Sequence, residues 1–155
     1  MTRPAAITTL IAALLCFFLS GCAGSRLIDQ PPFITLNNLH VEDEQVILDL
    51  GIRNVSPVEL ELQSIEFALS LDDTSLAVYN ASSAAVISAS GTENLRFEIP
   101  ASRDGLDLLE ALGSGARNNL AYRVEGEITV QDDLPLEISR NGYLYRVPGR
   151  PGHFR

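Results

Sequence analysis

Few side chains in this sequence are suited to covalent chemistry, and one of them stands in an informative place. The chain has two cysteines, Cys16 and Cys22, and two histidines, His40 and His153. Cys22 directly follows an apolar run and two small residues. Because a thiolate is a soft nucleophile, a cysteine at such a position can be modified covalently. What Cys22 does therefore depends on the run before it.

The apolar run extends from Ala5 to Leu19. It is shorter than the about 20 residues that a helix needs to cross a bilayer. It is also apolar on all sides, whereas a helix of a protein core has one apolar face. A charged start, an apolar stretch and small residues at a cleavage site are typical of a secretory signal peptide. Because Arg3, the run and Ser20-Gly21 follow in this order, we expect a signal peptide over residues 1–21.

The four residues Leu19-Ser20-Gly21-Cys22 resemble the lipobox of bacterial lipoproteins. The resemblance implies cleavage between Gly21 and Cys22 and a diacylglyceryl group on the Cys22 thiol, often with acylation of the new amine. Two or three acyl chains anchor a protein stably to a membrane that it does not span. In this family an Asp after the cysteine favours the inner membrane, and this chain has Ala23. We therefore expect a protein anchored to the outer membrane and facing the periplasm.

Cysteine count and charge exclude several classes of function. Without residues 1–21 only Cys22 remains, so the folded part has no disulfide, no thiolate metal site and no catalytic cysteine. The formal net charge is −9. Nucleic acids and anionic lipid surfaces attract clustered cations, so we expect no nucleic-acid partner and no broad binding of anionic lipid.

Domain boundaries follow from composition. Residues 22–32 are small and polar and end in two prolines, which predicts a lipid-anchored tether. Residues 33–147 are enough for one domain with its own core. Residues 148–155 are rich in proline and glycine and basic, which predicts a flexible tail. After Glu137 the chain has no acid but four arginines, and these are either solvated or contact lipid head groups or an acidic partner: Arg140, Arg146, Arg150 and Arg155.

Apolar residues alternate with polar ones along most of the domain, which predicts strands. The clearest strand has Val46, Leu48, Leu50 and Ile52 on one face. Further strands are predicted over 64–71, 76–79, 94–100, 121–130, 136–139 and 143–147. Asp72-Asp73-Thr74 predicts a turn, and Asn141-Gly142 predicts a hairpin. The regular spacing favours an antiparallel sandwich or barrel.

One segment predicts a short helix instead. Residues 101–115 begin with Ser102 as a candidate N-cap and place leucines at helical spacing before Gly113. Gly105 weakens this helix by up to about 1 kcal/mol, so packing has to support it. We expect the helix to lie across an end of the sandwich.

The order of these elements around Asn54-Val55-Ser56-Pro57 resembles the WHy (water-stress and hypersensitive-response) domain, which occurs in the second group of late embryogenesis abundant proteins and in bacterial lipoproteins. The resemblance covers residues 33–147. It implies a mostly β fold, an antiparallel Greek-key β-sandwich of immunoglobulin or fibronectin type with one short α-helix. It also implies a non-enzymatic domain linked to stress. Since Asn binds nearby backbone and proline ends strands, we expect Asn54 and Pro57 to form a structural turn.

Residue patterns of enzymes are missing from the sequence. There is no Gly-x-Ser-x-Gly elbow and no glycine-rich phosphate loop. The acidic groups at 42–44, 72–73 and 132–133 lack the spacing of a calcium loop and are expected in solvated turns. We expect no enzyme, no cofactor and no metal.

The sequence therefore predicts a membrane-anchored, non-enzymatic binding or protective domain, which acts in desiccation or osmotic stress of the cell envelope. Sheet edges or an apolar cleft would bind partly unfolded client proteins or acyl chains. The alternative is an accessory lipoprotein that docks on one protein partner of an envelope complex.

Overall fold

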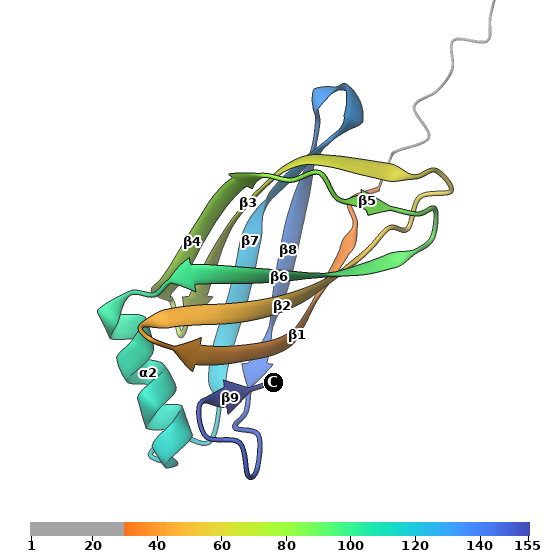
Figure 1. Cartoon of the computed structure of the whole chain (residues 1–155). Coiled ribbons are helices and arrows are strands. Elements are labelled where there is room, and N and C mark those ends of the chain that lie inside the picture. The colour runs from red at the N-terminus through yellow and green to blue at the C-terminus, as the bar shows by residue number, and fades with distance from the viewer. Residues whose placement is uncertain (1–29) are drawn as a thin grey trace, which may run out of the picture.

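The structure of the chain is a computed structural model that describes residues 30–155. The predicted signal peptide, its cleavage site at Gly21 and Cys22, and most of the tether lie outside the described residues. The described part contains, in order, β1 (Phe33–Glu42), β2 (Gln45–Arg53), β3 (Leu60–Leu71), β4 (Thr74–Ser82), β5 (Val86–Ile87), β6 (Thr92–Pro100), α2 (Arg103–Ser114), β7 (Leu120–Val130), a 3₁₀ turn (Gln131–Asp133), β8 (Leu134–Leu144) and β9 (His153–Phe154) (Figure 1).

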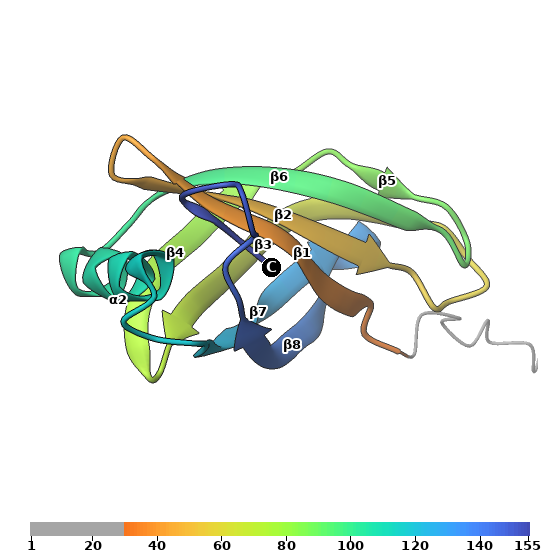
Figure 2. The same ribbon diagram turned by 90° about the horizontal axis from the view of Figure 1, so that it is seen from below.

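The strands form two antiparallel sheets. One has the strand order β6-β2-β1-β9, and the other has the order β4-β3-β7-β8 with β5 paired to β3. Figure 2 shows the sheets as two layers, with α2 at one end and the start of β1 at the other. The prediction of a mostly β fold with antiparallel strands and a short helix is confirmed. The Greek-key, immunoglobulin-like topology stays a prediction.

Alternating apolar residues build the core between the layers. Val46, Leu48, Leu50 and Ile52 of β2 are buried, as predicted. The alternating apolar residues of β3 are buried as well. Aromatic contacts connect the two sheets, since the rings of Phe67 in β3 and Phe97 in β6 meet edge to face with centroids 5.1 Å apart. Such pairs add packing energy beyond the buried area. Burial on one face thus explains why these strands could be read from the sequence.

Strand β1 was not predicted, because its pattern is irregular. Its pairing with β2 shifts between Leu36 and Asn38, which is the signature of a bulge. A bulge moves the following residues to the other face and breaks the alternation. The core positions of β1 could therefore not be predicted from an alternation of apolar residues.

The predicted hairpin at Asn141-Gly142 is wrong, because β8 continues through these residues. Asn141 pairs with Arg123 and Gly142 with Tyr122 of β7. Gly142 has no positive φ. Its lack of a side chain makes room instead, since a Cβ would lie 2.8 Å from Cε1 of the Tyr122 ring. The predicted strands 136–139 and 143–147 are thus one strand and its continuation.

Acidic residues make the real hairpin turns. The three loops joining β1 to β2, β3 to β4 and β7 to β8 each contain two successive acidic residues with positive φ, namely Asp43-Glu44, Asp72-Asp73 and Asp132-Asp133. Positive φ at both central residues matches the right-handed twist of the strands, and Asp tolerates it better than most residues. The turn predicted at Asp72-Asp73-Thr74 is confirmed.

The tail predicted to be flexible is part of the fold. Residues 148–152 form a turn, and β9 then pairs with Leu39 and His40 of β1. Phe154 is only 2% exposed. The backbones of Tyr145 and Arg155 exchange two hydrogen bonds of 2.9 and 3.0 Å. The folded domain therefore extends to residue 155 and does not end at 147.

Helix α2 forms as predicted and lies across one end of the molecule (Figure 1). The Ser102 hydroxyl caps it by accepting a hydrogen bond of 3.1 Å from the Gly105 amide. The helix ends at Ser114, and its C-cap Gly115 is left-handed with φ of 86°. Gly105 is needed for packing, because a Cβ there would lie 2.9 Å from the Leu76 Cα of β4. Close contact with β4 thus offsets the low helix propensity of glycine.

Candidate functional site: an acidic and apolar cleft at an open sheet edge

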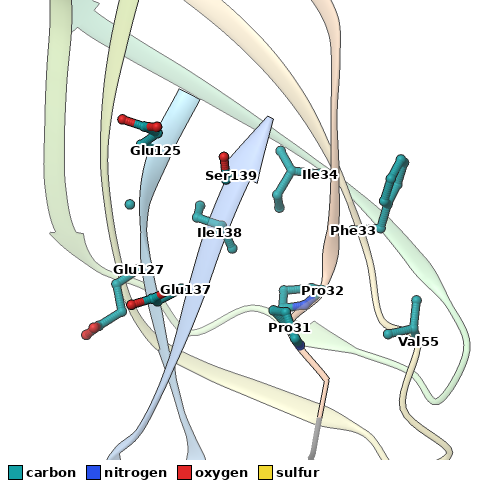
Figure 3. A pocket seen from close by; sticks show the side chains of 11 residues that line it. Pro31, Pro32, Phe33, Ile34, Val55, Glu125, Glu127, Glu137, Ile138 and Ser139 are labelled. Carbon is teal, nitrogen blue, oxygen red and sulfur yellow. The ribbon is translucent and has the colours of Figure 1, made fainter. Parts of the chain in front are cut away.

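A cleft lies where the two sheets meet beside the start of β1. Its volume is about 730 Å³, within the range of ligand pockets. We call it the seam cleft. It is lined by Pro31, Pro32, Phe33, Ile34, Val55, Glu125, Gly126, Glu127, Glu137, Ile138 and Ser139 (Figure 3).

The seam cleft has an apolar side and an acidic side. Figure 3 shows Phe33, Ile34 and Val55 on one side of β8 and the carboxylates of the three glutamates on the other. Phe33 is 49% exposed and Val55 39%. Exposed apolar side chains beside carboxylates favour a ligand that is both apolar and cationic.

The acidic side belongs to a row of glutamates that crosses three strands. Glu66 of β3 is paired with Glu127 of β7, and Glu127 is paired with Glu137 of β8. The Asn80 amide donates a 2.9 Å hydrogen bond to Glu66. Within residues 30–155, Glu127 and Glu137 form no ion pair, whereas Glu125 lies 3.8 Å from Arg123. Like charges directly opposite each other destabilise a sheet, so this row is unfavourable for the unbound domain.

Strand β8 is an edge of its sheet. It pairs with β7 on one side, and in the described part of the chain no strand pairs with its other side. An unpaired edge offers a row of backbone N–H and C=O groups to another extended chain. The C-terminal segment covers only the continuation of β8, at Tyr145 and beyond.

The sequence pointed to four arginines, of which the structure brings only two, Arg146 and Arg150, to one hollow. The Arg140 guanidinium lies 5.2 Å above the centre of the Phe33 ring, at the seam cleft, and its Nε is buried without a hydrogen-bond partner. Arg146 lies beside Gly115 at the C-terminal end of α2, where a cation is favourable. Arg146 and Arg150 line one hollow of about 360 Å³, and Arg155 is exposed at the end of the chain.

Asn54 and Pro57 lie in the loop between β2 and β3. Asn54 is fully buried. Its side-chain amide donates to the carbonyl oxygens of Val58 (2.7 Å), Ser88 (3.1 Å) and Ile87 (3.3 Å), and its Oδ1 accepts from the Ser56 amide at 2.8 Å. These bonds join the loop to the segment around β5. Pro57 is exposed, so the geometry gives Asn54 the larger part in holding this loop.

The two histidines, far apart in sequence, are stacked. The rings of His40 on β1 and His153 on β9 have centroids 4.7 Å apart and planes 18° from parallel. Burial and, next, the neighbouring His153 lower the pKa of His40 below its usual 6.5. A neutral His40 ring therefore favours the stack that joins β9 to β1.

Two further observations concern ions and membranes. Among the residues that the structure describes, no three His, Cys, Asp or Glu side chains are arranged to hold a metal ion. No helix between residues 30 and 155 has the length and hydropathy needed to cross a bilayer.

Sequence reasoning missed the glutamate row and the free edge. The Glu125-Gly126-Glu127 alternation and strands over 64–71 and 136–139 were predicted, but the pairing of these strands was not. Which side chains share a row depends on register between strands that are distant in sequence, and the false hairpin divided β8 into two pieces.

The chain was compared with protein families, curated proteins and solved structures. Residues 49–141 match the family model LEA_2, "Late embryogenesis abundant protein", and none of the curated proteins matches the chain. The solution structure of AT1g01470 from Arabidopsis thaliana is similar with a TM-score of 0.62 at 12% identity, covering 86% of this chain and 94% of that one.

Two other solved structures are less similar. A protein from Archaeoglobus fulgidus has a TM-score of 0.47 at 14% identity, covering 74% of this chain and 95% of that one. The putative late embryogenesis abundant protein At2g46140.1 also has a TM-score of 0.47 at 14% identity, covering 90% and 82%. The likeness to AT1g01470 shows a shared β-rich fold. Since the family model covers more than half of the sequence, the chain belongs to the late embryogenesis abundant (LEA_2) protein family.

Proposed function

We propose that this chain is a lipid-anchored, non-enzymatic protein that binds and protects partly unfolded envelope proteins during desiccation or osmotic stress. Membership of the LEA_2 family suggests a stress-related or protective role. The observation that carries the proposal is the seam cleft, which joins an unpaired sheet edge, an apolar wall and a row of carboxylates. Partly unfolded chains expose unpaired backbone and apolar side chains, which are the groups that such a cleft binds.

Anchoring is supported by the lipobox-like residues 19–22. It is also supported by exposed apolar side chains at the end of the domain that the tether joins. Figures 1 and 2 show the start of β1 and β5 at this end. Phe33 begins β1 and Val86 lies in β5, and the two side chains are 49% and 48% exposed. Val55, in the loop after β2, is 39% exposed. Exposed apolar side chains favour contact with a bilayer surface or a partner. We propose that the chain is a bacterial lipoprotein of the WHy type, anchored through Cys22 to the outer membrane and facing the periplasm.

The anchor is tested by the intact mass and membrane fractionation of the protein from its host, beside Cys22→Ala. The expected native chain begins at Cys22, carries acyl mass and is found in the outer-membrane fraction. The variant should lose both processing and membrane retention. A native chain that keeps residues 1–21, or is cut without lipid, contradicts the anchor.

Protection is tested separately, with the full chain in detergent and an aggregation-prone client enzyme that is dried or heated. Light scattering should fall at modest molar ratios of the full chain to the client. A detergent-matched control of bovine serum albumin separates specific protection from crowding. Unchanged scattering at every ratio refutes the protective function.

A second candidate, the accessory subunit, is favoured by an apolar groove at the other end of the domain. This groove, of about 380 Å³, lies between α2 and the β1–β9 pair and is lined mainly by Val41, Leu106, Leu109 and Phe154, with Glu44 and Glu110 among its other residues. Crosslinking in cells separates the candidates. One dominant adduct favours the accessory subunit, and many adducts favour protection of varied clients.

We also propose that the two sheets have Greek-key, immunoglobulin-like connections. The chain passes from one sheet to the other between β2 and β3, between β5 and β6, between β6 and β7, and between β8 and β9, which supports this topology.

A further inference from the structure

Strand β8 presents two different sides to a chain that would pair with its free edge. In an extended strand, successive side chains point to opposite faces of the sheet. On one face of β8 lie Glu137 and its neighbour Glu127. On the other face lies Ile138, with Ile34 and Phe33 across the seam (Figure 3). An added strand would therefore place alternate side chains against carboxylates and against apolar groups.

We infer that the seam cleft binds an extended polypeptide segment in which basic and apolar residues alternate, and that the segment pairs with the edge of β8. This inference rests on the proposed protective function and names the kind of client segment that the site takes. Backbone hydrogen bonds to β8 provide affinity that is independent of sequence, whereas the two faces select the alternation.

Charge fixes which side chains go to which face. Glu127 and Glu137 have no ion-pair partner within residues 30–155, so each gains from a cation of the client. Glu125 already lies near Arg123 and contributes less. On the apolar face the Arg140 guanidinium covers Phe33 and repels basic side chains. Basic residues are therefore directed to the glutamate face and apolar residues to the seam.

The glutamate row also explains why binding is favourable. Three carboxylates in register repel one another across Glu66, Glu127 and Glu137. A client that places two cations over this row removes the repulsion in the same step as it pairs with β8. A bare acyl chain would leave the carboxylates unpaired, so the row favours a polypeptide.

The probe is a fluorescein-labelled octapeptide of alternating arginine and valine, titrated into the full chain in detergent and followed by fluorescence anisotropy. Two peptides serve as controls: one with the same composition in two blocks, and one with glutamate in place of arginine. The alternating peptide should bind at least tenfold more tightly than either. Hydrogen exchange should slow in residues 134–144 when it is bound.

Matched variants separate the seam cleft from general charge. Glu127→Gln combined with Glu137→Gln should weaken binding of the alternating peptide about fivefold. Glu93→Gln combined with Asp107→Asn removes the same charge at exposed positions on other elements and should leave binding unchanged. Circular dichroism establishes that each variant is folded.

The outcomes are distinct. Equal affinity for the block peptide, unchanged exchange in β8, or equal effects of the two double variants overturns the inference. If the chain suppresses client aggregation but does not bind the alternating peptide, the protective function stands and this binding mode is wrong. If the peptide binds at β8 but no client is protected, the edge site stands and the protective function falls.

Discussion

Asn54 should be the polar residue whose loss destabilises the fold most. It is fully buried and makes four hydrogen bonds to the backbone of Ser56, Val58, Ile87 and Ser88. In Asn54→Ala these backbone groups lose their partner. A buried hydrogen bond contributes about 1 kcal/mol, and a group left unsatisfied costs about 1–3 kcal/mol. Since the amide has two hydrogens for three carbonyls, we expect the free energy of unfolding to fall by about 3–4 kcal/mol.

The measurement is urea unfolding followed by circular dichroism. Asn54→Asp is the sharper variant, because it keeps the volume and the acceptor for Ser56 but turns an oxygen toward three carbonyl oxygens. It should destabilise at least as much as Asn54→Ala. Asn80→Ala is the control, since Asn80 is exposed and donates one hydrogen bond to Glu66. It should cost less than about 0.5 kcal/mol. A loss below about 1 kcal/mol for both Asn54 variants would refute the structural role and favour a functional one.

Three further predictions concern stability. Glu127→Arg replaces two repulsions in the glutamate row by two attractions, so it should raise the free energy of unfolding by about 1 kcal/mol in thermal melts at low salt. The gain should be smaller at high salt and when the substitution is made in a Glu137→Gln background. An equal gain under either condition would contradict the repulsion within the row. Phe154→Ala should cost about 3–5 kcal/mol in urea unfolding, whereas a flexible tail predicts almost no loss. Because folding lowers the pKa of His40 below 6.5, the unfolded chain binds more protons, so stability should be full above that pH and fall as pH decreases through it. In urea unfolding at several pH values, the free energy of unfolding of His40→Asn should change less with pH than that of the natural chain. An unchanged pH dependence would show that another group causes the effect.

Some of these features could be predicted and others could not. The local sequence predicts the burial of alternate residues in β2 and β3, and it also predicts the Ser102 cap of α2. Asn141-Gly142 was misleading for a physical reason. The glycine serves contact with the Tyr122 ring and not a turn, and a single sequence does not distinguish these two uses.

The sequence by itself determined the lipobox-like residues before the domain, the period of the central strands and the position of the helix, because each depends on neighbouring residues. The tertiary structure decided what lies side by side. Register across β3, β7 and β8 created the glutamate row, and pairing of β9 with β1 brought His153 onto His40 and buried Phe154. Strand partners are chosen by core packing between segments far apart in the chain, so the seam cleft and the free edge of β8 exist only in the folded domain.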